Sequence, residues 1–143
     1  MISLFRENGA KCHLEWYKKA TTEAFAYNDL VGINTSGYVT KYLDGSAFPI
    51  LGSIKRTITS ASSDYATATK VPVEVCGEEA EYICDVSTGS AEQTNVGEYH
   101  DVDDSNSVDV SATSNNDIYV TGIISATKVL AKLTQKMGNV IES

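Results

Sequence analysis

The feature that most constrains this chain is its excess of β-branched residues over leucine. Val, Ile and Thr together occupy 37 of the 143 positions, whereas Leu occupies seven. A branched Cβ loses side-chain freedom in a helix but packs well on the pleated surface of a sheet. The hydrophobic fraction is 42% and there are only two prolines, which is typical of a globular chain and not of a disordered one. We therefore expect a β-rich globular protein.

Short alternating segments bounded by turn residues recur along the chain. The segment 71–76 has valine at every second position, so we expect these three valines in the core. Pro72 cannot donate a ladder hydrogen bond, which favours an edge strand or a strand start. Asn34–Gly37 is typical of a turn, and Gly52 within an apolar run indicates a bulge or bend. Strands at this spacing predict one small antiparallel β-barrel or sandwich.

The two ends of the chain are harder to assign. The first ten residues show no periodicity, so we expect an extended N-terminal arm. Residues 1–16 then hold the arm and the first strand, and residues 17–143 form a single β-domain. Residues 117–127 are consistent with one long strand whose buried face includes Ile118, Val120, Ile124 and Ala126.

Residues 128–137 fit two structures. Leu130, Leu133 and Met137 have helical spacing, whereas Val129, Ala131 and Leu133 also alternate as in a strand. The residues before this segment are already expected to be extended, which favours the strand.

The net charge of −8 is concentrated in one part of the chain. Residues 71–127 contain twelve acidic side chains and no Lys or Arg. Nucleic-acid binding requires cationic side chains that displace counterions from phosphates, so we expect neither nucleic acid nor an anionic membrane as a partner. The acidic part is interpreted either as a solvated surface or as a complement to a basic patch on a partner. No stretch approaches the roughly 20 apolar residues of a membrane span, and residues 1–8 do not resemble a secretory signal.

The three cysteines are an odd number with no close pair, which argues against a disulfide framework. Cys76 and Cys84 facing each other across a hairpin is the alternative. Reduced thiols in a cytoplasm are the expectation.

The residue types that carry catalysis are sparse. The histidines are His13 and His100, and no Gly-x-Ser-x-Gly elbow is present to supply a nucleophile. His100 and Asp101 are neighbours on an expected strand, where adjacent side chains point to opposite faces. The cysteines and histidines lack zinc-site spacing. We therefore expect the protein not to be an enzyme and to use no cofactor.

One string has the oxygen-rich character of a calcium loop. Residues 101–105 place Asp or Ser side chains at the first, third and fifth positions. However, Asn106 occupies the position where glycine makes the turn, and Ala112 the position of the bidentate glutamate. We expect a plain loop and no metal.

Aromatic residues gather near the N-terminus, where Trp16, Tyr17, Phe25 and Tyr27 occur within twelve positions. They fit either a core cap over the first strand or an interface anchor, because Trp and Tyr dominate interface hot spots.

The order of segments carries a family resemblance. The strings concerned are Leu14–Ala20, Asn28–Val31, Ile50–Gly52, Lys55–Ile58, Val71–Val75, Tyr82–Val86, Val96–Tyr99, Ser107–Val110, Gly122–Ile124 and Thr127–Leu130. This succession of strands and turns, over residues 10–134, resembles the small decoration (cement, or head-auxiliary) proteins of tailed-phage capsids. The resemblance is one of pattern, with no invariant chemical signature and no catalytic residues to carry over.

The resemblance implies a structural virion protein that binds the outside of the capsid and stabilises the shell. Its partner would be the major capsid protein, and it would be a homo-oligomer, with a trimer favoured. It would be synthesised in the host cytoplasm and reside on the capsid surface of the virion. A protein that binds only the assembled shell stabilises that shell by mass action.

For this function, we expect the contact residues in the N-terminal segment and its first strand: Ile2, Leu4, Phe5, Trp16 and Tyr17. Two alternatives stay open. One is another virion component, such as a tail or fibre protein. The other is a carbohydrate-binding surface β-domain, with exposed aromatics such as Tyr99 or Tyr119 as a platform.

Overall fold

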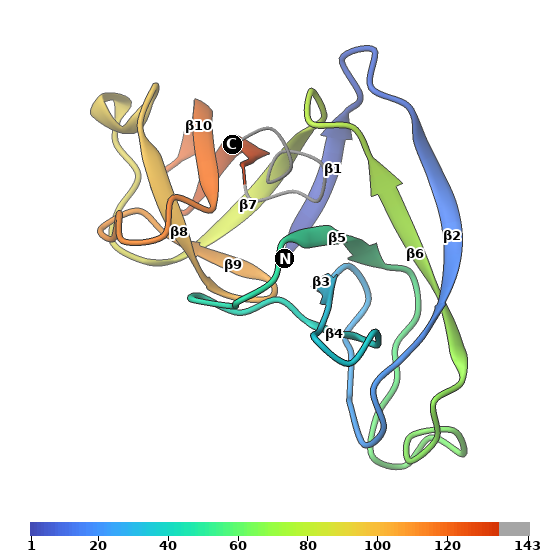
Figure 1. Ribbon diagram of the computed structural model, residues 1–143. Coiled ribbons are helices and arrows are strands. Elements are labelled where there is room, and N and C mark those ends of the chain that lie inside the picture. Colours follow the sequence, from blue (N-terminus) through green and yellow to red (C-terminus); the bar gives the residue numbers. More distant parts are fainter. Residues whose placement is uncertain (135–143) are drawn as a thin grey trace.

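The computed structural model describes residues 1–134, and this part of the chain is built from β-strands (Figure 1). It confirms the expected all-β class and contains a closed barrel. A single 3-10 turn, Gln93–Asn95, is the helical element of this part. None of residues 1–134 lies in a helix long and apolar enough to cross a membrane. The strands are β1 (Ile2–Arg6), β2 (Cys12–Lys18), β3 (Leu30–Ile33), β4 (Val39–Lys41), β5 (Ile50–Ile54), β6 (Lys70–Cys76), β7 (Glu81–Thr88), β8 (Tyr99–Asp104), β9 (Ser107–Asp109), β10 (Ile118–Ser125) and β11 (Lys128–Leu133).

Five strands close into the barrel in the order β7-β11-β10-β8-β9. Closure depends on β7, whose residues Val86 and Thr88 pair in parallel with β9. The earlier part of β7, residues 81–84, pairs antiparallel with β1. The sixth strand, β1, therefore extends the sheet beside the seam at which the barrel closes.

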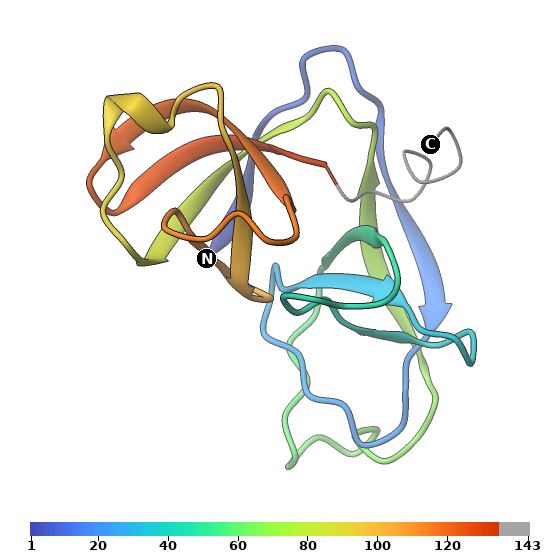
Figure 2. The same ribbon diagram turned by 60° about the vertical axis from the view of Figure 1, so that its left-hand side comes forward.

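The second sheet is open and has the order β2-β6-β5-β3-β4. It lies beside the barrel, and the β1–β2 and β6–β7 connections run next to each other between the two parts (Figures 1 and 2). The strand β2 forms its outer border. Within residues 1–134, the pairing found on the other side of β2 is an isolated parallel bridge directly after its last residue, between Lys19 and Val39 of β4. Residues 12–17 of β2 have no strand on that side and form a free edge.

Two hydrophobic clusters hold the molecule together. The larger cluster fills the barrel, and it also includes Leu30, Tyr42 and Ile50 from the open sheet and its loops, so the barrel and the sheet share a core. The smaller cluster lies under the open sheet and contains Val71 and Val73. Val75 packs against it, which confirms the expected core face of residues 71–76.

The structure does not confirm the extended N-terminal arm. Residues 2–6 form β1, and Ile2 opposite Cys84 is completely buried in the larger cluster. Arg6 donates from Nε to Glu81 Oε1 at 2.8 Å. A strand of only five residues is too short to show a clear periodicity in the sequence. Its place in the fold comes from pairing with β7.

The expectation that Pro72 marks an edge strand or a strand start is wrong, because β6 lies between β2 and β5. The Pro72 carbonyl accepts from the Lys55 backbone N–H at 2.9 Å. The nitrogen and the carbonyl of one strand residue point to the same side, so the nitrogen of Pro72 also faces β5. It lies opposite Lys55, one residue beyond Ile54, which is the last residue of β5 in the ladder with β6. No ladder donor is missed at that point.

The expectation of reduced thiols is also corrected. Cys12 and Cys76 form a disulfide, and they stand directly opposite each other in the β2–β6 ladder. Sequence separation of 64 residues hid this pairing. Cys84, the alternative partner for Cys76, is a free buried thiol on β7.

The C-terminal strands partly follow the expected pattern. The strand assignment is confirmed for β11, residues 128–133, whereas residues 135–137 of that prediction lie outside the described residues. In β10, Ile118 and Val120 are buried as expected, but Ile124 is exposed, and Ala126 lies exposed in the turn that follows the strand. The β10–β11 register shifts between Val120 and Gly122. This bulge reverses the alternation, so that Ile123 packs against the core instead.

Candidate functional site

The free edge of β2 is a candidate contact surface, because it combines exposed apolar side chains with unpaired backbone groups. Trp16 stands opposite Pro72, whose carbonyl bonds to β5 and not to β2. The backbone N–H and C=O of Trp16 therefore point away from β6, toward the open side. Backbone N–H and C=O groups alternate between the two sides along a strand, so those of Leu14, two residues before Trp16, point to the same open side. The edge thus offers unpaired donors and acceptors to another chain.

Two large apolar side chains stand on this edge. Leu14 is 57% exposed and Trp16 is 60% exposed. Both belong to the outward face of the sheet, because Val73 and Val71, which stand opposite Glu15 and Tyr17, are fully buried on the other face. We call the pair Leu14 and Trp16, with the free backbone groups of β2, the β2 edge surface.

A polar chain fixes the opposite face of β2. The Tyr17 hydroxyl donates to the Glu15 carboxylate, and His13 Nε2 lies 2.9 Å from Glu15 Oε1. Burial and the Glu15 carboxylate raise the pKa of Tyr17 to about 12. The hydrogen bond from Tyr17 in turn lowers the pKa of Glu15. At neutral pH, Tyr17 therefore stays a donor and Glu15 an acceptor.

The structure separates the five expected contact residues. Trp16 lies on the β2 edge surface, and Tyr17 points to the opposite face. Ile2 is buried, Leu4 is half-buried against the barrel core, and Phe5 is exposed with the Arg6 guanidinium over its ring. Since β1 is an integral strand, we expect removal of residues 1–8 to destabilise the fold itself.

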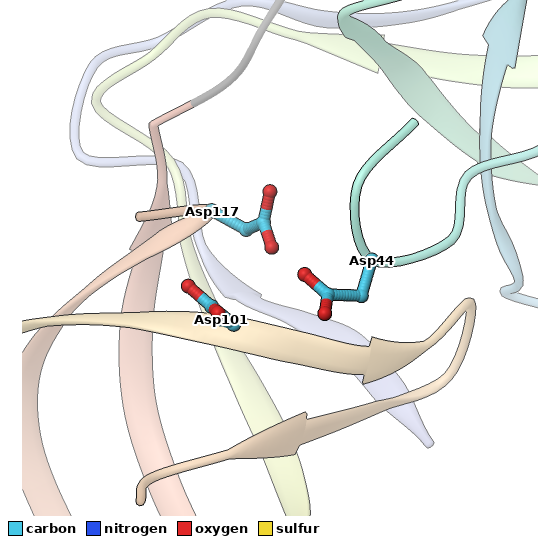
Figure 3. Close-up of side chains that lie close together, drawn as sticks. All are labelled: Asp44, Asp101 and Asp117. Carbon is cyan, nitrogen blue, oxygen red and sulfur yellow. The ribbon is translucent and has the colours of Figure 1, made fainter. Parts of the chain in front are cut away.

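A second group of functional side chains comes from three separate segments. Asp44 lies in the β4–β5 connection, Asp101 on β8 and Asp117 immediately before β10, and their carboxylates point toward one another (Figure 3). One oxygen from each lies within 4.8 Å of the others. Asp101 and Asp117 are buried, whereas Asp44 is exposed.

Hydrogen bonds account for the two buried carboxylates. Asp101 accepts the backbone N–H groups of residues 114, 115 and 116 at 2.8–3.0 Å. Asp117 accepts the Tyr42 hydroxyl at 2.6 Å and the Val102 N–H at 3.0 Å. Burial raises the pKa of Asp117, although both hydrogen bonds oppose that shift. These contacts fasten the 111–117 loop and the β4–β5 connection to the barrel.

The three carboxylates could offer oxygen ligands to a divalent cation. Their existing partners, including the Asn115 amide that donates to Asp44 Oδ1 at 2.5 Å, give them a structural role without one. This cluster could not be predicted from the sequence, since nothing in the string 101–106 indicates Asp44 or Asp117. Of that string, Asp104 instead accepts from Asn106 and Ser107 within its own hairpin turn.

The histidines lie in different parts of the fold. His13 is on the open sheet, where it contacts Glu15. His100 is buried in β8, where its two ring nitrogens lie 3.2 Å from the Ala112 carbonyl and 3.1 Å from Glu98 Oε1. The two rings therefore do not contribute to a common site.

Charge divides the molecule in the same way as the two sheets. Residues 77–134, which include β7 to β11, carry eleven acidic and two basic side chains. Residues 10–76, which include the open sheet, carry six acidic and seven basic side chains. The barrel is therefore strongly acidic, whereas the open sheet is nearly neutral.

No protein-family model matches the chain, and no curated protein is significantly similar to it.

Proposed function

We propose that this protein is a structural decoration protein of a tailed-phage capsid. It binds the outside of the shell, contacts the major capsid protein and stabilises the assembled particle. In this proposal it is made in the host cytoplasm, acts as a homo-oligomer with a trimer favoured, and performs no catalysis.

The observation that carries the proposal is the β2 edge surface. Leu14 and Trp16 stand two residues apart on the border strand β2, whose edge is free at these residues, and each is more than half exposed. A long edge strand with apolar side chains favours association with another chain. The succession of strands and turns over residues 10–134 resembles that of phage decoration proteins. This resemblance is the reason for proposing a capsid as the surface to which β2 binds.

The energetics of such a contact suit a capsid lattice. Burying one large apolar side chain is worth about 2 kcal/mol, so two such residues give a weak contact when a single copy binds. An oligomer that engages several subunits gains avidity from the lattice. The near-neutral charge of the open sheet also fits an interface, because interface cores are depleted of charged residues.

The test uses expanded shells assembled from the major capsid protein of the phage that encodes this chain. Purified protein is added, the shells are sedimented, and bound copies are counted by quantitative gel densitometry. The proposal predicts saturable binding at hundreds of copies per shell. A few copies confined to a vertex or tail would indicate another virion component, and absence of binding would contradict the proposal.

Matched variants locate the contact. Trp16→Ala and Leu14→Ser should each lower shell occupancy about tenfold at sub-saturating protein. Tyr27→Ala and Leu43→Ala remove exposed apolar side chains elsewhere and should leave occupancy unchanged. If all four variants lost shell occupancy equally, β2 would not be the contact surface.

A further inference from the structure

A groove on the outer surface of the barrel contains two tyrosines and three charged side chains. It has a volume of about 450 Å³, and its walls include Glu78, Glu79, Tyr99, Tyr119 and Lys132. It lies on the barrel and not on β2, so an inference about it does not depend on the proposed capsid function.

The two tyrosines are placed together by the ladder between β8 and β10. Tyr99 stands directly opposite Tyr119, and their ring centroids are 5.1 Å apart with the planes inclined at 60°. The neighbouring pair, His100 and Ile118, is buried, so strand alternation directs both tyrosines outward. Tyr99 is 49% exposed. The barrel thus presents an aromatic surface to solvent.

Charged side chains continue this surface. Lys132 of β11 stands opposite Tyr119, so Tyr99, Tyr119 and Lys132 form a row across three adjacent strands. Lys132 Nζ donates to Glu79 Oε2 at 3.2 Å. The groove therefore combines ring faces with a donor and carboxylate acceptors, a mixture typical of sites that bind a small polar molecule.

The charges narrow the class of ligand. An anionic ligand would approach a barrel region with eleven acidic and two basic side chains, which repels it. A wholly apolar ligand would displace the water that hydrates Glu79 and Lys132, and it offers no hydrogen bonds in place of those that the water made. The same charge attracts a cation to the barrel, but the groove itself holds it weakly. Lys132 already pairs with Glu79, which leaves Glu78 as the other lining carboxylate, and a single exposed ion pair contributes little.

A neutral sugar satisfies both parts of the groove. A pyranose ring has an apolar C–H face that can stack on a tyrosine, and hydroxyl groups at its rim that can donate to carboxylates and accept from an ammonium. We propose that the groove formed by Tyr99, Tyr119, Glu79 and Lys132 binds a neutral hexopyranose oligosaccharide.

The test is an NMR titration of the full chain, labelled with ¹⁵N, with maltohexaose and with cellohexaose. The two probes present α- and β-linked glucose. At least one should shift the backbone amides of Tyr99, Tyr119 and Lys132 in a saturable manner, with a Kd of about 1 mM. Failure of both sugars to shift these amides at about 10 mM would overturn the proposal.

Variants separate stacking from unspecific binding. Tyr99→Ala and Tyr119→Ala should each raise the Kd about fivefold or more, whereas Tyr27→Ala, an exposed tyrosine outside the groove, should leave it unchanged. Circular dichroism checks that each variant is folded. An unchanged Kd in both groove variants would contradict the proposal, as would binding of tetralysine at the groove in preference to either sugar.

Discussion

The barrel and the open sheet each contain five paired strands, but the barrel closes on itself whereas the open sheet ends in border strands. In the barrel, pairing of β7 with β9 closes the ring, and closure removes the edges of these five strands, to which other chains could add. Beside the ring, β1 forms a short border of its own. In the open sheet, β2 keeps a free edge and carries Leu14 and Trp16. The acidic charge lies on the closed part and the exposed apolar edge on the nearly neutral part. We infer that the acidic barrel keeps the protein in solution, whereas the open sheet carries the contact surface.

The largest difference between the two halves should appear at their glycines. In the open sheet, a Cβ added at Gly52 would lie 2.1 Å from the Glu74 carbonyl oxygen, which is backbone and cannot move aside. In the barrel, a Cβ at Gly122 would meet the nearest atom of Leu130 at 3.4 Å. We expect Gly52→Ala to cost about 4 kcal/mol or more of unfolding free energy, and Gly122→Ala less than about 1 kcal/mol. Urea denaturation measures both, and similar costs would show that β5 and β6 do not approach this closely.

The disulfide should be the next largest contribution, and it acts on the open sheet. It joins β2 to β6 and closes a long loop of chain. The double variant Cys12→Ser/Cys76→Ser should lose about 3 kcal/mol of unfolding free energy. Reductant should destabilise the natural protein by a similar amount and leave the double variant unchanged, because Cys84 is unpaired. A natural protein indifferent to reductant would contradict the Cys12–Cys76 bond.

On the barrel side, stability should depend on acid through Glu81. Arg6 donates to this buried carboxylate, as do Thr121 and Asn8, and the bond from Arg6 is the main cause that lowers its pKa from 4.5 to about 2. A lowered carboxyl pKa stabilises the fold above the unfolded value and loses that effect as pH falls toward the folded value.

We therefore expect the natural protein to be about 2 kcal/mol more stable than Glu81→Gln at pH 7, and this gap to shrink between pH 4.5 and pH 2. Denaturation of both proteins across that range measures the gap. A gap independent of pH would mean that the ion pair with Arg6 does not stabilise the barrel.

The smallest effect on folding should come from the most exposed side chains. Trp16→Ala and Leu14→Ser should each change the unfolding free energy by about 0.5 kcal/mol or less, because both side chains lie mostly in solvent. A loss of several kcal/mol would show that these residues support the fold, and the β2 edge surface would lose its assignment as a contact surface.

Local patterns predicted the parts of the fold that depend on neighbours in sequence. The alternating valines of residues 71–76 lie in the core as expected, and the turn at Asn34–Gly37 forms, with Asn34 Oδ1 accepting from Ser36 and Tyr38. The irregularity expected near Gly52 is present as a register shift in the β3–β5 ladder.

Features that depend on distant pairing could not be predicted. The pairing of Cys12 with Cys76, the closure of β7 on β9 and the meeting of Asp44 with Asp117 all follow from topology. The contact residues divide in the same way. Trp16 belongs to a residue type common in interface hot spots and could be identified from the sequence. The burial of Ile2 could not, because it depends on pairing with Cys84 of β7, more than 80 residues further along the chain.

The most direct test of the account is the disruption temperature of expanded shells, followed by light scattering during heating. Shells saturated with the natural protein should disrupt at a clearly higher temperature than bare shells, because a ligand of the assembled state stabilises that state. Shells mixed with a Leu14→Ser/Trp16→Ala variant should behave like bare shells. Equal disruption temperatures with and without the natural protein would contradict the claim that the open sheet binds and stabilises a capsid.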